Sequence, residues 1–317
     1  MLRNSSAFFA ASSYVYSMHS DSNLNSSTPE PTRFLERLQS NKPLIGVELR
    51  PPRRDLTRSG AIDSWIDLSH SVRRVVSRDA FLMLTDNTVG QEEEENLQHL
   101  TVNLTSEVEP WRLVPFLTTK HSLEYCLHYG DRAQLGGLDA LTVVGGDVIG
   151  AARCVPHSYE LRQQLRGRAP GMALGGWVNP HHPTDEQIQF VMDPNFEADY
   201  YLTQVVSQHE LPMVERWLRA TDDAGLNIPG AFGVFFYRNG RRDSLKRLSS
   251  FLPVPVDAIA AEFESGISPV KHCANAIIAL RKLGIKHIYL CNLGAHRAGA
   301  LFEQILAEIQ IQSTGPS

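Results

Sequence analysis

Two acidic residues, Glu48 and Asp147, each stand at the end of an apolar stretch of the sequence. Glu48 follows the run 44–47, and Asp147 follows the run 140–144 and two glycines. A carboxyl group walled in by apolar groups has a raised pKa and can donate a proton near neutral pH, whereas a carboxylate in a more polar setting stays ionised and stabilises a cation. Two roles are therefore available to these residues, that of a general acid and that of a carboxylate that stabilises a cation.

Each acid also has a purely structural interpretation. Glu48 could pair with Arg50, because strand alternation places these two residues on the same face. Gly145, Gly146 and Asp147 could form a tight turn in which the aspartate caps a helix. The sequence leaves both interpretations open.

The surrounding sequence indicates how these residues are positioned. From Pro43 onward, eight short apolar runs alternate with segments of helical period, which is typical of βα units and a parallel sheet. The expected strands cover residues 44–49, 80–85, 113–118, 140–145, 172–178, 200–205, 231–236 and 287–292. Between the last two, Pro253 and Pro255 split the helical pattern into two short helices before a longer one.

Eight strand-plus-helix units in roughly 270 residues match a closed (β/α)8 barrel. We therefore predict an α/β protein with one (β/α)8 barrel over residues 42–317. Residues 1–41 begin with a Ser- and Asn-rich stretch without sustained period, and we predict a disordered extension there.

In such barrels the working residues lie at the carboxyl ends of the strands. Polar residues at these ends are expected to converge on one pocket with Glu48 and Asp147. They are Thr85, Asp86, Thr118, Thr119, Lys120, Gly146, Asn179, His181, His182, Thr203, Gln204, Tyr237 and Asn292.

Some of these residues also have a structural interpretation. Gln204 could be a hydrogen-bonded amide at a sheet end, and His181 with His182 could be a solvated loop pair. The run 92–95 of four glutamates is predicted to be a solvated helix face. Because no HxH or HExxH spacing is present, the sequence predicts no metal site.

The composition excludes several classes of protein. A formal charge of −5 gives no indication of a nucleic-acid partner. No apolar run approaches the ~20 residues that span a bilayer, and the 4 cysteines form no CxxC pair. We therefore expect a soluble protein of the reducing cytoplasm with its cysteines in the core, and the oligomeric state stays open.

Several of these stretches together resemble the methylenetetrahydrofolate reductase family, whose members are (β/α)8 enzymes. The family's first strand carries Phe-Glu-Phe-Phe-Pro-Pro, and residues 47–52 read Val-Glu-Leu-Arg-Pro-Pro. Strand 3 of the family ends His-Leu-Thr and strand 4 ends Leu-Arg-Gly-Asp. Here residues 116–118 read Phe-Leu-Thr and residues 144–147 read Val-Gly-Gly-Asp.

The later strands continue the resemblance, which runs from about Lys42 to Ile311. Residues 177–183, Trp-Val-Asn-Pro-His-His-Pro, are similar to the family's Tyr-Pro-Glu-x-His-Pro loop with one extra residue. Residues 202–204, Leu-Thr-Gln, match its Ile-Thr-Gln, and the stretch 228–236 resembles its Pro-Gly-Ile strand 7.

The resemblance implies an activity: reduction of 5,10-methylenetetrahydrofolate to 5-methyltetrahydrofolate in one-carbon metabolism, or the reverse oxidation. It implies that Glu48 protonates a folate nitrogen, that Asp147 stabilises the resulting iminium ion, and that Gln204 hydrogen-bonds the pterin. Tyr237 and Asn292 are the further candidates for substrate binding. Candidates for cofactor binding are Thr85, Thr118, Gly146, His181 and His182.

The resemblance also implies NAD(P)H and FAD as cofactors, but the residues depart from the family where the flavin diphosphate is neutralised. Phe116 replaces the family's His, Gly145 replaces its Arg, and residues 169–215 contain no Lys or Arg. Because a diphosphate needs cations or helix N-termini, we predict that the chain holds FAD poorly or not at all.

Two other functions remain open at this level. The chain could be a folate-binding or partner-dependent barrel without redox activity. It could also be a lyase that uses Lys120, just beyond strand 3, as a Schiff-base amine. The sequence does not distinguish NADH from NADPH.

Overall fold

The computed structural model describes residues 32–86, 93, 95–105, 107–146 and 152–314. Eight parallel strands close into a barrel in sequence order, which confirms the predicted (β/α)8 fold. The strands are β1 Leu44–Leu49, β2 Phe81–Leu84, β3 Leu113–Thr118, β4 Ala140–Val144, β5 Ala173–Val178, β6 Tyr200–Val205, β7 Gly230–Phe235 and β8 His287–Cys291. Every predicted strand is present, with ends within about one residue of the prediction.

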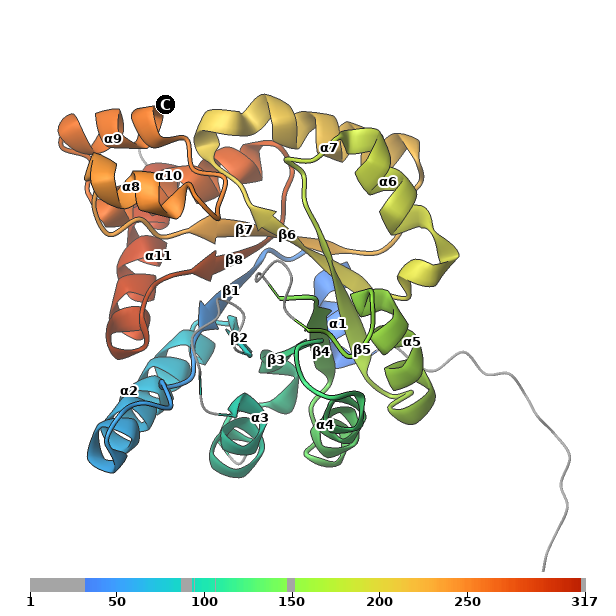
Figure 1. Cartoon of the computed structure of the whole chain (residues 1–317). Helices are drawn as coiled ribbons and strands as arrows, with labels where there is room; N and C mark the ends of the chain where they lie inside the picture. The colour runs from blue at the N-terminus through green and yellow to red at the C-terminus, as the bar shows by residue number, and fades with distance from the viewer. Residues whose placement is uncertain (1–31, 87–92, 94, 106, 147–151, 315–317) are drawn as a thin grey trace, which may run out of the picture.

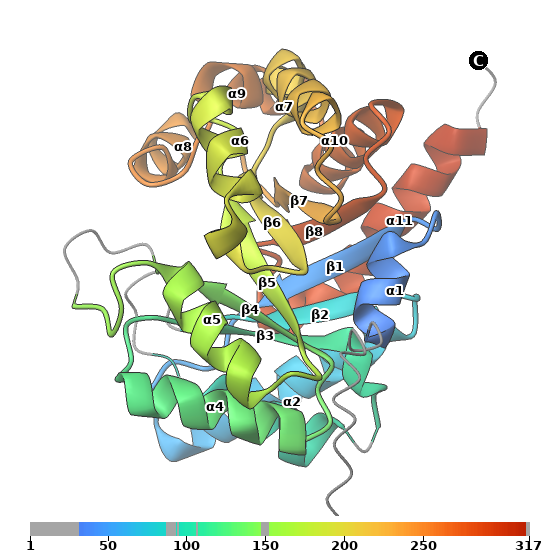
Figure 2. The same cartoon turned by 90° about the vertical axis from the view of Figure 1, so that its right-hand side faces the viewer.

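The helices surround the ring of strands on the outside (Figures 1 and 2). They are α1 Arg33–Gln39, α2 Arg58–Val76, α3 Asn96–His99, α4 Leu123–Leu135, α5 Ser158–Arg168, α6 Thr184–Met192, α7 Leu211–Asp223, α8 Arg242–Leu248, α9 Val256–Glu264, α10 Pro269–Lys282 and α11 Ala298–Thr314. Several begin at a residue whose hydroxyl accepts a backbone N–H, including Thr57, Ser122 and Ser268, as expected for N-caps. No described helix combines the length and apolar composition needed to cross a bilayer.

Alternation along the strands divides the apolar residues between two cores. In β1, Ile45, Val47 and Leu49 face the helices, whereas Leu44 belongs to the cluster that fills the barrel interior. Gly46 also faces the interior, where a Cβ would lie 2.3 Å from the Phe81 ring. This parity directs the side chain of Glu48 into the barrel as well.

Helix α1 closes the end of the barrel at which the strands begin. Phe34 is 0% exposed, and its ring contacts Phe81 at a centroid distance of 5.3 Å and Tyr200 at 5.2 Å. Phe81 and Tyr200 are the first residues of β2 and β6. The prediction of disorder through residue 41 is therefore wrong for residues 33–39, because Phe34 and Leu38 lie one helical turn apart and bury a common face. The other residues of the predicted extension, 1–31, lie outside the described residues.

The segment between β7 and β8 is longer than one connecting helix. It contains the two short helices predicted on either side of Pro253 and Pro255, α8 and α9, followed by the longer α10. A separate apolar cluster holds this insertion, formed by Tyr237 after β7 with Leu245, Ile259 and Ala260. The insertion thus packs on the carboxyl end of β7, where barrels carry their sites.

Candidate active site at the barrel mouth

Glu48 occupies an interior position near the carboxyl end of β1. It is only partly buried, although its neighbours Val47 and Leu49 are fully buried. Burial, and next the negative charge of Glu48, raises the pKa of Cys291, which ends the adjacent strand β8. The Glu48 carboxylate therefore lies at the opening of the barrel interior, as the sequence predicts.

Arg50, the residue proposed as an alternative partner of Glu48, forms an ion pair with Glu93 at 2.6 Å. Glu93 is 3% exposed, accepts a hydrogen bond from the Thr85 hydroxyl at 3.1 Å, and accepts one from Arg54 through its backbone carbonyl. The prediction of a solvated helix face is wrong for Glu93, because Arg50 compensates its buried charge. The hydroxyl of Thr85, a predicted cofactor residue, is therefore hydrogen-bonded to Glu93.

The ends of β2 and β3 are joined through Asp86. Its carboxylate accepts hydrogen bonds from the Thr118 backbone N–H at 2.8 Å and from the Thr118 hydroxyl at 3.0 Å. The same carboxylate lies 2.8 Å from His121 Nε2. These partners satisfy a carboxylate that is 8% exposed. Thr118, a predicted cofactor residue, therefore fixes the rim between these strands.

Two cations lie beside the end of β4. Gly146 has φ +81°, and a Cβ there would lie 2.4 Å from Lys120 Cε. Arg153 Nη2 donates to the Gly146 carbonyl at 3.4 Å. The same guanidinium would lie 3.0 Å from a Cβ at Gly145. Asp147, the second predicted acid, lies outside the described residues.

Trp177 faces the barrel interior from β5, directly across the ring from β1. It packs against the interior cluster and is partly exposed. Trp177 is not among the site residues predicted from the sequence. Strand alternation places Trp177 on the same face as Ala173 and Gly175, and this pattern could have indicated that Trp177 points into the barrel.

Gln204 lies at an irregularity of β6, where the register with β7 shifts between Leu202 and Val205. Its Oε1 accepts a hydrogen bond from the Val205 N–H at 2.9 Å, so the interpretation as a hydrogen-bonded sheet-end amide holds for that atom. The Thr203 hydroxyl accepts from the Gly233 N–H in the shifted region. Bulges of this kind redirect side chains and are common beside sites.

The two histidines after β5 differ in environment. His181 is partly buried, and its Nε2 lies 2.9 Å from the Val205 carbonyl. His182 is exposed, and its backbone N–H donates to the Asn179 carbonyl. Only His181 is therefore held against the neighbouring strand end.

Tyr237 and Asn292, the two further substrate candidates, line one pocket of about 310 Å³ beside β7 and β8. Phe235, Arg238 and Arg247 also line it. Asn292 adopts φ +69° and its Nδ2 donates to the Phe236 carbonyl at 3.0 Å. Burial raises the pKa of the Tyr237 hydroxyl.

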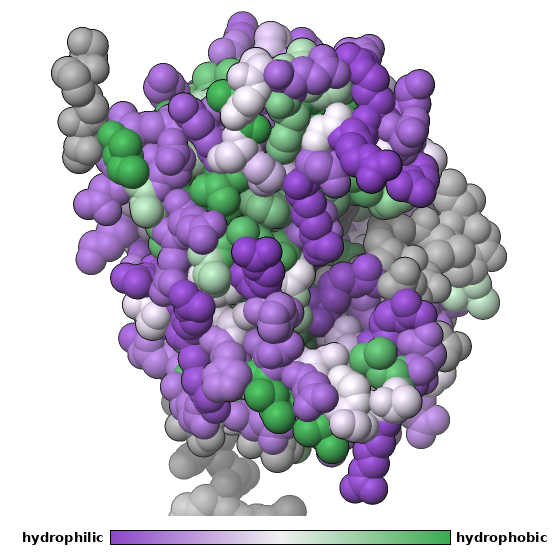
Figure 3. Space-filling model, turned by 90° about the vertical axis from the view of Figure 1, so that its left-hand side faces the viewer, coloured by the Kyte–Doolittle hydropathy of each residue, from purple (hydrophilic) through white to green (hydrophobic). Residues whose placement is uncertain are grey.

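Figure 3 shows the face toward which β1, β7 and β8 point in Figure 1, with polar side chains around a hollow near its middle.

A further group of titratable residues lies outside the barrel interior, on three separate elements. His209 is in the short 3-10 helix Gln208–Glu210 after β6, Glu262 is on α9, and His272 is on α10. One ligand atom from each of the three lies within 4.8 Å of the others. No sequence motif could have found this group, because its members are far apart in the chain.

Neither the protein-family models nor the curated proteins compared with this chain match it. Among solved structures, it is similar to an uncharacterized protein from Clostridium thermocellum that binds two copies of 5-methyl-5,6,7,8-tetrahydrofolic acid. That match has a TM-score of 0.64 and 16% identity, and it covers 89% of this chain and 100% of the other.

Tryptophan synthase from M. tuberculosis matches with a TM-score of 0.46 and 10% identity, covering 88% of this chain and 99% of that one. Dihydrodipicolinate synthase from Bacillus clausii matches with a TM-score of 0.46 and 12% identity, covering 87% of this chain and 77% of that one. The similarity to the Clostridium protein supports the (β/α)8 fold.

Proposed function

We propose that this chain binds a reduced folate at the carboxyl mouth of the barrel and interconverts its methylene and methyl forms with NAD(P)H. One observation carries the proposal: a partly buried acid, Glu48, and a partly exposed indole, Trp177, face the same opening from opposite strands of the ring. An acid and an aromatic surface are what a pterin with a weakly basic nitrogen requires. That the structurally similar Clostridium protein binds 5-methyltetrahydrofolate supports the choice of ligand.

Glu48 would act as the general acid. Protonation of the folate nitrogen opens the five-membered ring of methylenetetrahydrofolate and leaves an iminium ion, and hydride transfer to its carbon gives the methyl group. Asp147 and Gln204 are proposed to stabilise the cation and to hydrogen-bond the pterin.

The pocket beside β7 and β8 suits the rest of the folate. The rings of Phe235 and Tyr237 offer a surface for the aminobenzoyl ring, since aromatic pairs attract beyond their buried area. Arg238 and Arg247 line the same pocket and could pair with the glutamate carboxylates. This arrangement supports the substrate role proposed for Tyr237 and Asn292.

The described residues fit FAD only in part. Lys120 and Arg153, beside the end of β4, would be the cations that hold its diphosphate. The position of the family's strand 3 histidine, however, is filled by the buried ring of Phe116, which is 2% exposed. We therefore propose that hydride passes directly from the nicotinamide, and a stoichiometric flavin spectrum that survives gel filtration would contradict this.

An anaerobic assay of the full chain tests the proposal. Methylenetetrahydrofolate is supplied with NADH or NADPH, with and without added FAD, while 5-methyltetrahydrofolate binding is measured by calorimetry. Turnover with a nicotinamide supports the reductase. Binding without turnover under any donor supports a folate-binding barrel without redox activity, and absence of binding removes the folate proposal.

A lyase that uses Lys120 remains the third candidate, because this amine lies beside the end of β4. Borohydride trapping with a carbonyl substrate distinguishes it. A covalent adduct on Lys120 in mass spectrometry would support the lyase, and an unmodified Lys120 would exclude a Schiff base with that substrate.

A further inference from the structure

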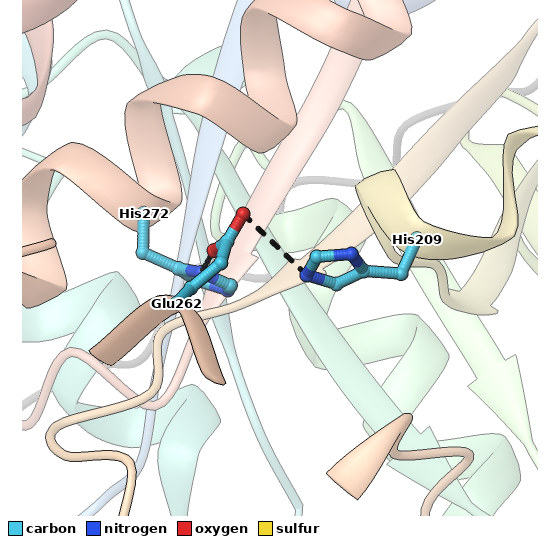
Figure 4. A group of neighbouring side chains, drawn as sticks. All are labelled: His209, Glu262 and His272. Atoms are coloured by element: carbon cyan, nitrogen blue, oxygen red, sulfur yellow. Dashed lines mark hydrogen bonds and ion pairs between the residues drawn. The ribbon is translucent and has the colours of Figure 1, made fainter. Parts of the chain in front are cut away.

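The side chains of His209, Glu262 and His272 come together (Figure 4), and His272 contacts Tyr237, which follows β7. Figure 4 shows His209 and His272 on either side of the Glu262 carboxylate. His209 Nε2 lies 3.5 Å from Glu262 Oε1, and His272 Nδ1 is hydrogen-bonded to Glu262 Oε2. Each residue thus directs one nitrogen or oxygen toward the same small volume.

We propose that these three residues bind one divalent transition-metal ion, with zinc as the best-fitting ion. Two imidazoles and a carboxylate form a ligand set that zinc takes in proteins, with a water in the fourth position. With metal–ligand distances of about 2.0–2.1 Å, ligand atoms at tetrahedral angles lie about 3.3 Å apart. The observed 3.5 Å between His209 Nε2 and Glu262 Oε1 is close to that spacing. His272 Nδ1 and Glu262 Oε2 are closer because they share a hydrogen bond, and its proton would be released when the ion binds.

The hydrogen bonds around the cluster provide a second, independent argument. Within the described part of the chain, three buried side-chain atoms of one tripeptide make no hydrogen bond: Gln208 Oε1, His209 Nε2 and Glu210 Oε2. His209 Nε2 has only its 3.5 Å contact with Glu262. Buried polar atoms are normally partnered, and a cation would satisfy His209 Nε2 directly. Gln208 Nε2 donates to Glu262 Oε1 at 2.6 Å and so orients the carboxylate from outside the cluster, as outer hydrogen bonds do in metal sites.

The burial of the three residues suits an ion that arrives from solvent. The side chain of His272 is 3% exposed and forms the inner side of the site. The side chains of His209 and Glu262 are 22% and 24% exposed and leave an approach. The cluster is therefore closed on the side of His272 and accessible to solvent on the side of His209 and Glu262.

Such an ion would join the loop after β6 to helices α9 and α10. The ring of Tyr237 packs edge-on against His272, with centroids 5.5 Å apart and planes at 83°. The ion would thereby fix the insertion that forms one wall of the Tyr237 pocket. This role does not depend on the identity of the ligand in that pocket.

The test uses the full chain, stripped with a chelator, incubated with zinc sulfate and passed through gel filtration before metal analysis. We expect one zinc per chain and a higher Tm with zinc than without it. His209→Asn and Glu262→Gln should each weaken zinc binding by at least about 100-fold. The control, His128→Asn, removes a histidine of α4 whose side chain is 61% exposed and should retain one zinc.

Retention of no zinc by the parent chain would overturn the proposal, as would equal retention by the parent and His209→Asn. Because His209 is partly exposed on a short 3-10 helix, its substitution should leave the fold intact. A thermal scan of the metal-free variant checks this. Circular dichroism of metal-free Glu262→Gln shows whether this variant is folded. If it is unfolded, its loss of zinc says nothing about Glu262 as a ligand, and the His209 variant decides the outcome.

Discussion

Trp177 of β5 and Tyr289 of β8 lie inside the barrel with their ring centroids 6.4 Å apart. Tyr289 is 1% exposed and its hydroxyl donates to the Thr203 carbonyl, whereas Trp177 is partly exposed. The buried tyrosine therefore supports the indole from below and leaves part of it accessible from the mouth.

Replacing this indole should weaken folate binding. Trp177→Leu removes an aromatic surface worth about 0.5–1.5 kcal/mol in a ring pair, so the Kd for 5-methyltetrahydrofolate should rise about 2- to 12-fold. Calorimetric titration measures it. The matched control is Trp65→Leu, which alters an indole of α2 that stacks on His99 outside the barrel. An equal effect of both variants would mean that Trp177 has no direct role in binding.

Glu48→Gln keeps the size of the side chain but removes the proton of the proposed general acid. Turnover of methylenetetrahydrofolate should fall about 100-fold or more, while the Kd for 5-methyltetrahydrofolate should change little. Steady-state rates at saturating substrate provide the measurement. Glu124→Gln on α4, whose side chain is 86% exposed, should be fully active. Near-normal turnover in Glu48→Gln would remove this residue from the acid role.

Helix α1 should contribute to the stability of the barrel through Phe34. Phe34→Ala leaves a cavity beside Phe81 and Tyr200, and such truncations cost about 3–5 kcal/mol of unfolding free energy. Urea unfolding measures the change. Phe251→Ala, at a side chain that is 58% exposed, should cost less than about 0.5 kcal/mol. Equal stability of both variants would show that α1 does not support the barrel.

His287 should make the protein less stable in mild acid. Burial lowers the pKa of His287 to about 4 from an ordinary 6.5, so the folded state binds fewer protons than the unfolded state between these two pH values. The unfolding free energy contributed by this group is therefore complete above pH 6.5 and falls as the pH drops toward 4, by at most about 3 kcal/mol.

The test of this pH dependence is His287→Leu, which removes the titrating ring. Its Nδ1 has no hydrogen-bond partner among the described residues, so an apolar side chain there loses only the hydrogen bond of the ring with the Leu38 backbone. Urea unfolding at pH 7 and pH 5 should show a smaller loss of stability in this variant than in the parent. His296→Gln, at a side chain that is 76% exposed, should behave like the parent. An identical pH dependence in all three proteins would contradict the prediction.

Cysteine reactivity should differ across the chain, with Cys154 the fastest. Burial raises the pKa of Cys273 to about 12 and also raises the pKa of Cys126 and Cys291. Because the thiolate is the nucleophile, these three should react slowly at pH 8. Cys154 is only partly buried. Peptide mass spectrometry after brief iodoacetamide treatment should show alkylation at Cys154 at least about 10-fold faster, and comparable labelling of Cys126 would contradict this.

The barrel follows from local patterns in the sequence. Eight apolar runs separated by helical segments leave little choice of fold, because buried parallel strands must be apolar on both faces and each needs a crossover helix. The same regularity placed Glu48 at a strand end. Local signals are sufficient for such features because each element is specified by its own residues. Helix α1 was missed because a pattern of 7 residues is too short to separate from a coil.

Tertiary structure decided which residues meet. The burial of Glu93 depends on arginines about forty residues earlier in the chain, and the position of Gln204 depends on a register shift against β7. His209, Glu262 and His272 come together only because the insertion after β7 folds back beside the loop after β6. These contacts arise from packing between elements that are distant in the chain, and no local period or spacing encodes them.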